Sequence, residues 1–218
     1  MVALNRVDLT IEKGEVCCFL GTSGSGKSTL LNMMAGLEKP TKGTILIKNE
    51  MVSTMSEKKL ARFRQDNVGF IFQSYNLLTS LTALENVCLP LTFKRIPKVK
   101  REKIALHFLK EVGLKKYALH KPTQMSGGQQ QRVGIARAFV GTPSIIFADE
   151  PTGNLDSKTS EYVMNLMLKL VRENEQTLII VTHDNEIAKY ADKVVYIKDG
   201  NVEKIELKEG DVKTYVHS

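Results

Sequence analysis

The chain has 218 residues, of which 42% are hydrophobic and 25% are charged. These proportions exclude collagen-like, disordered and membrane-spanning classes, and the length allows one large domain or a core with an inserted lobe. The net charge of +7 permits nucleic acid, anionic lipid or phosphate-bearing ligands as partners and does not choose among them. Much of the excess lies in residues 94–121, where a solvated helix face is the simpler explanation.

Cysteine usage and apolar run lengths indicate the compartment. Cys17 and Cys18 are adjacent in an apolar run, and Cys88 completes an odd count without metal-site spacing. We therefore interpret all three as core residues in a reducing compartment. No apolar run approaches the 18 or so residues needed to cross a bilayer. We expect a cytoplasmic protein without direct membrane insertion, so that any membrane part belongs to another chain.

Short apolar runs rich in Val, Ile and Phe predict central strands that are covered on both faces. They span residues 16–20, 68–72, 145–148, 178–181 and 194–197. Helix-length segments separate them, so we expect right-handed crossovers and a mostly parallel sheet in an α/β fold. Asp199-Gly200 lies between residues 194–197 and residues 202–207, which predicts a tight turn and a terminal β-hairpin.

The first of these strands leads into Gly21-Thr22-Ser23-Gly24-Ser25-Gly26-Lys27-Ser28, which matches G-x-x-x-x-G-K-[ST] and opens a predicted helix toward Ala35. Glycines let successive backbone N–H groups turn toward phosphate oxygens, and the helix N-terminus adds partial positive charge. Lys27 would reach the outer phosphates, and Ser28 would offer its hydroxyl to Mg²⁺. The segment predicts a nucleoside triphosphate site of the P-loop type.

Residues 73–140 carry helical signals and no convincing strand. We interpret them as a helical lobe inserted into a core formed by residues 1–72 and 141–218, the whole chain being one domain.

Local signals within this lobe mark its helices. Thr82 and Glu85 have capping-box spacing, and an amphipathic stretch at 104–112 ends before a glycine. Pro90 and Pro97 are expected to break helices.

A second candidate phosphate contact, Ser126-Gly127-Gly128-Gln129, opens another predicted helix. Small residues at a helix N-terminus expose N–H groups suited to a γ-phosphate, although the tetrapeptide alone is also a plain serine cap with glycine spacers. Two phosphate contacts on separate lobes suggest that each nucleotide is held between two copies of the chain.

The strand at 145–148 ends in two carboxylates, Asp149 and Glu150. Ligands bind beyond the carboxyl ends of parallel strands, so this pair is expected beside the phosphate loop. Asp149 would hold Mg²⁺, and Glu150 would orient or deprotonate the attacking water. Alone the pair is more often a helix cap; together with the phosphate loop it favours catalysis. Asp156 or Ser157 then opens a helix.

These motifs together resemble the nucleotide-binding subunits of ABC transporters, from Val2 to about Gly200. The resemblance places the family's phosphate loop on residues 21–29, which include Thr29, and its signature on residues 125–129. It places the magnesium aspartate on Asp149 and the catalytic glutamate on Glu150.

The resemblance also assigns roles that the residues alone do not give. Gln73 and His183 taken alone are satisfied polar residues at strand ends, whereas the resemblance makes both γ-phosphate or Mg²⁺ sensors and Gln73 a magnesium ligand. The family's D-loop falls on residues 154–156, which brings Asp156 to the nucleotide. Residues 70–78 and 149–156 are similar to the lipoprotein-release, macrolide-efflux and antimicrobial-peptide-resistance branch, with a cell-division ABC ATPase as a neighbour.

The sequence departs from the family pattern at two places. Met125 replaces the usual leucine, a volume-conserving change expected to be harmless. No Tyr, Phe or Trp precedes Phe19, where the family has an aromatic residue that stacks on adenine. That platform is absent, supplied elsewhere or part of a longer chain. We therefore expect ATP to bind weakly and GTP to bind within a few-fold of ATP.

The resemblance thus implies an ATPase that binds ATP and Mg²⁺, dimerises around two nucleotides and drives a transmembrane permease through the surface near residues 73–84. It would lie peripherally on the cytoplasmic face of the membrane. A nucleic-acid-associated ABC ATPase of repair or chromosome organisation is the alternative, favoured only by the +7 charge. The sequence contains no coiled-coil heptads and no zinc-spaced cysteines, so no nucleic acid partner is expected.

Overall fold

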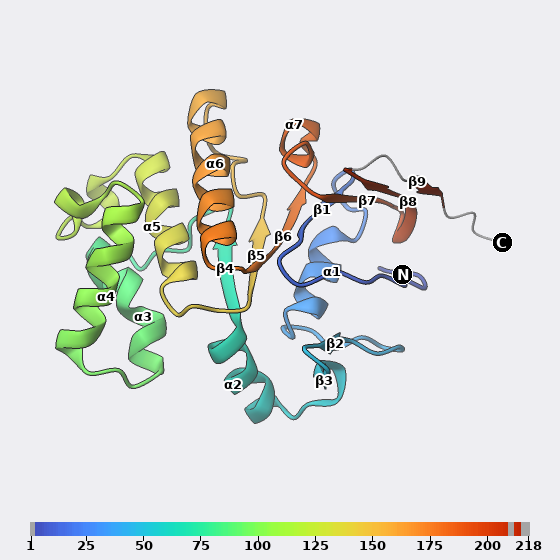
Figure 1. Ribbon diagram of the computed structural model, residues 1–218, viewed down its shortest axis with the longest axis horizontal. Coiled ribbons are helices and arrows are strands. Elements are labelled where there is room, and N and C mark those ends of the chain that lie inside the picture. Colours follow the sequence, from blue (N-terminus) through green and yellow to red (C-terminus); the bar gives the residue numbers. More distant parts are fainter. Residues whose placement is uncertain (1–2, 209–211, 215–218) are drawn as a thin grey trace.

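The computed structural model describes residues 3–208 and 212–214, and its centre is a seven-stranded sheet in the order β4-β5-β6-β1-β7-β8-β9 (Figure 1). The strands are β1 (Val16–Leu20), β4 (Val68–Phe72), β5 (Ile145–Asp149), β6 (Thr177–Thr182), β7 (Lys193–Lys198), β8 (Asn201–Leu207) and β9 (Val212–Thr214). Neighbours from β4 through β7 pair in parallel, and β8 and β9 continue the sheet antiparallel. The predicted mostly parallel sheet is confirmed.

Strand β1 shows why the predicted strands are continuously apolar. All five of its residues are buried. Cys17 and Phe19 pack with Leu30 and Leu31 of helix α1 (Lys27–Met34) on one face. On the other face, Val16, Cys18 and Leu20 belong to the core cluster that includes Ile187 and Ala188 of α7 (Asn185–Ala188), the helix that contacts β1. A strand covered on both faces needs apolar side chains at successive positions, which is the pattern found.

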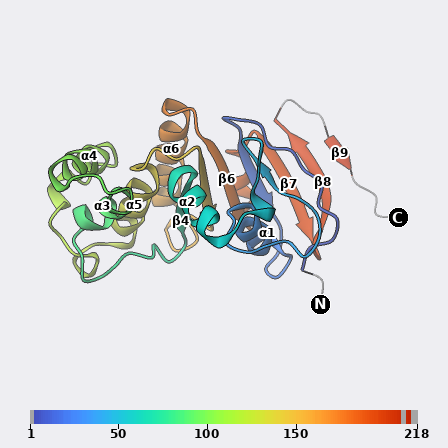
Figure 2. The same cartoon turned by 90° about the horizontal axis from the view of Figure 1, so that it is seen from below.

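The remaining helices lie beside this sheet or beyond its β4 end (Figures 1 and 2). They are α2 (Glu57–Asn67), α3 (Ala83–Phe93), α4 (Lys98–Glu111), α5 (Gly127–Phe139), α6 (Ser157–Glu173) and α7 (Asn185–Ala188), with short 3₁₀ turns at Val52–Thr54, Lys115–Tyr117 and Pro122–Gln124. Asp156 is the N-cap of α6, and its carboxylate accepts the Thr159 N–H at 3.0 Å. None of the helices in the described ranges 3–208 and 212–214 could cross a membrane by length and apolarity.

Helices α3, α4 and α5 lie together at one end of the molecule (Figure 1). The predicted capping box is present, because Thr82 N donates to Glu85 Oε2 at 2.8 Å and Glu85 N donates to Thr82 Oγ1 at 3.2 Å. Within residues 73–140, all of them described, the structure contains no strand.

The expectation that Pro90 breaks a helix is wrong. Pro90 lies inside α3, which continues to Phe93. A proline removes one helical hydrogen bond, but the buried side chains of Val87 and Leu91 on either side of it hold α3 against its neighbours. Pro97 does mark a break, because it is the N-cap of α4.

The predicted terminal hairpin joins β7 and β8 through Asp199 and Gly200, whose φ angles are 48° and 77°. Positive φ at both central positions is the type I′ geometry that Asp-Gly favours.

Three other elements had weak sequence signals. Strands β2 (Leu46–Ile47) and β3 (Glu50–Met51) have two residues each, and α2 buries only Leu60 and Phe63.

Candidate functional site

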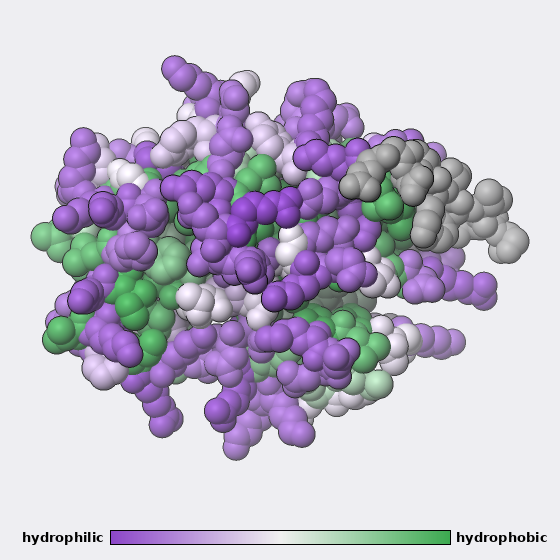
Figure 3. All heavy atoms as spheres, viewed as in Figure 1, coloured by the Kyte–Doolittle hydropathy of each residue, from purple (hydrophilic) through white to green (hydrophobic). Residues whose placement is uncertain are grey.

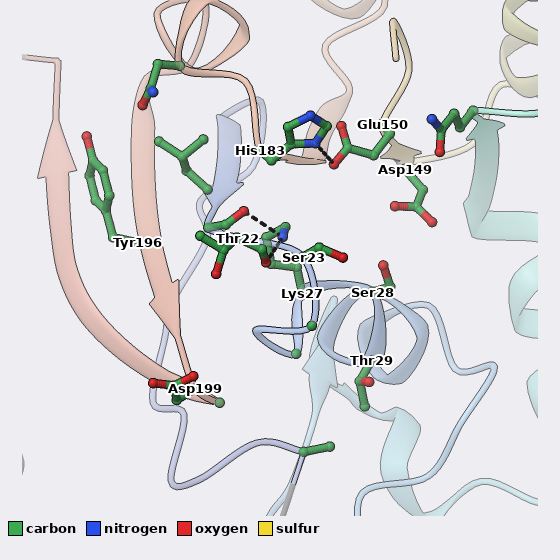
Figure 4. Close-up of a pocket in the computed structure, with 18 residues that line it drawn as sticks. Thr22, Ser23, Lys27, Ser28, Thr29, Asp149, Glu150, His183, Tyr196 and Asp199 are labelled. Carbon is green, nitrogen blue, oxygen red and sulfur yellow. Dashed lines mark hydrogen bonds and ion pairs between the residues drawn. The ribbon is translucent and has the colours of Figure 1, made fainter. Parts of the chain in front are cut away.

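A cleft of about 1180 Å³ opens beyond the carboxyl ends of the parallel strands. Its walls come from the phosphate loop, the ends of β1, β4, β5 and β6, and the β7–β8 hairpin. The residues that line it are Ala3, Leu20, Gly21, Thr22, Ser23, Gly24, Gly26, Lys27, Ser28, Thr29, Gln73, Asp149, Glu150, His183, Asn185, Tyr196, Asp199 and Gly200 (Figure 4). Segments far apart in sequence meet here because parallel strands present their carboxyl ends at one edge.

The phosphate loop wraps around the buried side chain of Lys27. The Lys27 ammonium donates to the main-chain oxygens of Gly21 at 2.8 Å and Thr22 at 2.7 Å. Burial lowers the pKa of Lys27, while the negative charges of Glu150 and Asp149 oppose that shift. Gly26 precedes α1 with φ 99° and no side-chain cap, so the first N–H groups of the helix have no capping side chain. The loop therefore presents a cation and a helix N-terminus to the cleft, the combination that binds phosphate.

Glycine is required at the start of this loop for steric reasons. A Cβ on Gly21 would lie 2.2 Å from the main-chain oxygen of Ile197 in β7. The close approach of β7 explains why the hairpin residues Asp199 and Gly200 reach the cleft.

Ser25 is the one predicted residue of the loop that does not line the cleft. It is 2% exposed, and its hydroxyl has no hydrogen-bond partner among the described residues. Its main-chain N–H donates to Thr22 O at 3.3 Å, a hydrogen bond within the loop that stabilises its turn.

Asp149 and Glu150 lie beside the loop, as predicted from their place at the end of β5. Figure 4 shows Asp149 facing Ser28. Burial and the nearby Glu150 carboxylate raise the pKa of Asp149, while Lys27 and the Ser28 hydroxyl oppose the shift. A further positive charge beside Asp149, such as a metal ion, would therefore stabilise its ionised form.

This arrangement predicts a stabilising substitution. A raised pKa means that the ionised form of Asp149 destabilises the fold at neutral pH, an effect absent below the ordinary pKa of 3.8 and present once the pH exceeds the folded pKa. We expect Asp149→Asn to raise the thermal unfolding midpoint of the nucleotide-free protein at about pH 7, with a gain that shrinks as the pH falls toward the ordinary pKa of 3.8.

The exposed Asp8→Asn is the matched control and should leave the midpoint unchanged. Thermal melts across this pH range would contradict the account if Asp149→Asn lowered the midpoint.

Glu150 is held by Thr182, the last residue of β6, and by His183, which follows it. His183 Nδ1 lies 2.7 Å from Glu150 Oε1, and because a carboxylate only accepts, the imidazole donates through Nδ1 (Figure 4). The Thr182 hydroxyl accepts the Asp184 N–H at 3.1 Å and donates its own proton to Glu150 Oε2 at 3.0 Å. Glu150 itself has φ 45°, in the left-handed region that residues other than glycine seldom adopt. Both carboxylate oxygens are therefore fixed in direction.

Gln73 reaches the cleft from the end of β4, and the segment after Glu150 holds its main chain. Asn154 Nδ2 donates to Gln73 O at 2.9 Å, and a Cβ on Gly153 would lie 2.8 Å from Gln73 Nε2. Asp156, two residues beyond Asn154, is exposed and engaged in capping α6, outside the residues that line this cleft.

The tetrapeptide from Ser126 to Gln129 also lies outside this cleft. It starts α5 with a capping box, in which Gln129 N donates to Ser126 Oγ at 3.3 Å and Ser126 N donates to Gln129 Oε1 at 2.9 Å. The chain therefore brings together the phosphate loop, Gln73, Asp149, Glu150 and His183, and leaves Ser126, Gly127, Gly128, Gln129 and Asp156 apart from them.

Several residues of the cleft were not predicted from the sequence. Thr182 supports Glu150, and Thr22, Asn185, Tyr196 and Asp199 line the walls. Tyr196 is the only Tyr, Phe or Trp among the described residues of the lining; its hydroxyl donates to Glu206 at 2.7 Å, which raises the pKa of Tyr196 to about 12. Thr22 lay within the phosphate-loop motif, whereas Tyr196 had no local signal because β7 borders β1 only in the folded sheet.

Comparisons with known proteins show the family of the chain. The model of the ABC transporter family matches residues 4–153. The "uncharacterized ABC transporter ATP-binding protein MJ0796" of Methanocaldococcus jannaschii is 49% identical over 208 residues, covering 94% of this chain and 88% of that protein. A solved dimeric structure of MJ0796, described as a post-hydrolysis state bound to ADP and Pi, superimposes with a TM-score of 0.89 at 47% identity, covering 96% of this chain and 92% of that one.

Two further relatives carry transport names. The macrolide export ATP-binding/permease protein MacB of a Shewanella strain is 47% identical over 200 residues, which are 92% of this chain and 31% of MacB. The lipoprotein-releasing system ATP-binding protein LolD of Syntrophotalea carbinolica is 45% identical over 199 residues, covering 91% of this chain and 86% of LolD. These similarities confirm the predicted resemblance, and the chain belongs to the ABC transporter family as an ATP-binding subunit of the ATPase type.

Proposed function

We propose that the cleft binds Mg-ATP and hydrolyses it, and that the chain does so as one half of a dimer that drives a permease. The observation that carries this proposal is the convergence of Lys27, Ser28, Asp149 and Glu150 at one edge of the sheet. The groups proposed to contact phosphates are those of the loop and the start of α1: Gly21, Ser23, Gly24, Ser25, Gly26, Lys27, Ser28 and Thr29. Ser25 would contribute its main chain.

The residues beside the loop fit a magnesium ion. Ser28, Gln73 and Asp149 supply hydroxyl, amide and carboxylate oxygens, the donor types that Mg²⁺ prefers. The raised pKa of Asp149 marks a carboxylate that a cation would stabilise. When bound, the ion would neutralise charge on the terminal phosphates.

Glu150 is the proposed general base. Its two oxygens are held by His183 and Thr182, so it can accept a proton from a water placed in line with the γ-phosphate. His183 and Gln73 are the proposed sensors of that phosphate. Catalysis of this kind depends mainly on positioning and on charge stabilisation.

A second copy of the chain would complete each site. Ser126, Gly127, Gly128, Gln129 and Asp156 lie outside the cleft of their own chain, which suits contact with the nucleotide of a partner. The relative MJ0796 was solved as a dimer bound to ADP and Pi.

The permease contact is proposed for residues 73–84. In this segment the apolar side chain of Leu78 is 50% exposed, which suits a contact with another protein. The names of the relatives MacB and LolD point to an efflux or lipoprotein-release system. Figure 3 shows further hydrophobic surface at the end formed by α3 and α4, where Phe93 and Val99 are exposed. In this proposal the core (residues 1–72 and 141–218) binds nucleotide, and the helical lobe (residues 73–140) transmits the movement of the dimer to the permease. The permease would hold the chain on the cytoplasmic face of the membrane.

The test is hydrolysis and binding of nucleotide with Mg²⁺ titrated from zero. We expect ATP hydrolysis that needs Mg²⁺ and falls by about 100-fold or more in Lys27→Ala, because the loop then lacks its only buried cation. In calorimetric titrations, the dissociation constant for GTP should lie within a few-fold of that for ATP. Hydrolysis by Lys27→Ala at the wild-type rate would contradict the assignment of the site. In the titration, tight and ATP-selective binding by the wild-type protein would show that residues such as Tyr196 hold adenine.

A further inference from the structure

Helix α5 contacts the segment after Gln73 through one arginine, Arg137, near the C-terminal end of the helix. Its guanidinium donates to the main-chain oxygen of Asn76 at 2.5 Å and to that of Tyr75 at 2.8 Å. Both partners are main-chain groups, so the contact fixes the path of the backbone whatever the side chains do. Arg137 is half-buried, and burial lowers the pKa of its guanidinium.

The backbone that Arg137 binds has an unusual conformation. Tyr75 and Asn76 have φ angles of 61° and 46°, two successive left-handed residues of which neither is glycine. Asparagine tolerates this region, but a bulky aromatic residue does so only when its surroundings impose it. Two hydrogen bonds from a planar, rigid guanidinium to adjacent carbonyls provide such an imposition.

The same helix contacts this segment and the segment after Glu150 at other points. A Cβ on Gly127 would lie 2.8 Å from Tyr75 Oη, so the first turn of α5 closely approaches the Tyr75 ring. One turn further, the buried Gln131 donates through Nε2 to the main-chain oxygen of Pro151. The segment after Glu150 in turn binds Gln73 through Asn154. Helix α5 and the two segments that carry Gln73 and Glu150 therefore form a closed set of contacts.

We propose that Arg137 is a positioning residue for ATP hydrolysis: it fastens residues 74–76 to helix α5, so that Gln73 and the Ser126 end of the helix move as one unit. The inference rests on the roles proposed above for Gln73 and Ser126. Without Arg137 the left-handed backbone at Tyr75 would relax, and Gln73 would sample positions outside the cleft. Because hydrolysis depends on positioning, this loss lowers turnover more than it lowers nucleotide binding.

The test combines Arg137→Ala, Gln73→Ala and the double variant in a mutant cycle. We expect Arg137→Ala to lower kcat by about tenfold while KM for ATP changes by less than about twofold. If Arg137 acts through Gln73, the double variant should be no slower than Gln73→Ala alone. Arg137→Lys, which keeps the charge and one donor group, should recover part of the loss.

Arg64→Ala is the matched control, because Arg64 also donates to a main-chain oxygen at 2.5 Å, that of Gly36, but lies on α2. Hydrogen exchange of the free protein supplies a readout independent of activity: amide exchange at residues 74–78 should rise in Arg137→Ala and stay unchanged in Arg64→Ala.

The proposal is overturned if the losses in Arg137→Ala and Gln73→Ala multiply in the double variant. It is also overturned if Arg137→Ala matches Arg64→Ala in both kcat and exchange. Wild-type hydrolysis in Gln73→Ala would instead refute the role proposed for Gln73. In that case, raised amide exchange confined to residues 74–78 in Arg137→Ala would still support the attachment of residues 74–76 to α5 by Arg137.

Discussion

Replacing Glu150 by glutamine should abolish ATP hydrolysis while preserving ATP binding. The amide has the shape of the carboxylate and can keep the hydrogen bond from the Thr182 hydroxyl, but it cannot accept a proton from water. We expect kcat to fall by about 10²- to 10⁴-fold, the range typical for loss of a general base. Because closure no longer leads to hydrolysis, the variant should accumulate as an ATP-bound dimer, seen by size-exclusion chromatography with light scattering.

Glu161→Gln provides the control for this change, since Glu161 is exposed on α6. It should hydrolyse ATP at the wild-type rate and remain a monomer under the same conditions. Wild-type turnover by Glu150→Gln would remove Glu150 from the role of base. A hydrolysis defect without dimer accumulation would indicate that binding was lost as well.

Combining a damaged phosphate loop in one chain with a damaged Ser126 segment in the other should restore activity. If sites form between chains, a heterodimer of Lys27→Ala with Ser126→Arg carries both lesions in one site and leaves the other intact. Each variant alone has a lesion in both sites and should be inactive. We therefore expect hydrolysis by heterodimers purified through two different tags, at a rate well above that of either homodimer.

The reciprocal heterodimer separates the two models. A chain carrying both Lys27→Ala and Ser126→Arg, paired with a wild-type chain, has one lesion in each shared site and should be inactive. Sites confined to one chain would reverse both results, because the wild-type partner would then keep a complete site. Activity of the reciprocal heterodimer, together with inactivity of the first, would refute the shared site.

Contiguous motifs could be predicted because their geometry is local. Strand β1, the phosphate loop and α1 follow one another in the chain, so the residues from Gly21 to Ser28 indicate both the turn and its ligand. Asp149 and Glu150 end a strand in the same way. Their closeness to the loop followed from a general property of parallel sheets, which place the carboxyl ends of their strands at one edge.

Contacts between distant residues could not be predicted in this way. Thr182 reaches Glu150 because β5 and β6 are neighbours in parallel register, with Asp149 opposite Val181. Tyr196 enters the cleft because β7 lies next to β1, opposite Leu20. Pro90 shows the converse error, a strong local signal that tertiary packing overrode.

The sequence by itself determined the class of the protein: apolar runs specified buried parallel strands, and the phosphate-loop and Asp-Glu motifs specified a nucleotide site where those strands end. The tertiary structure decided how the site is held. The hydrogen bonds from Thr182 to Glu150 and from Arg137 to Tyr75 and Asn76 join residues separated by 32, 62 and 61 positions. Such contacts depend on strand order and helix packing, because a hydrogen bond forms only when the fold brings its donor and acceptor within about 3 Å.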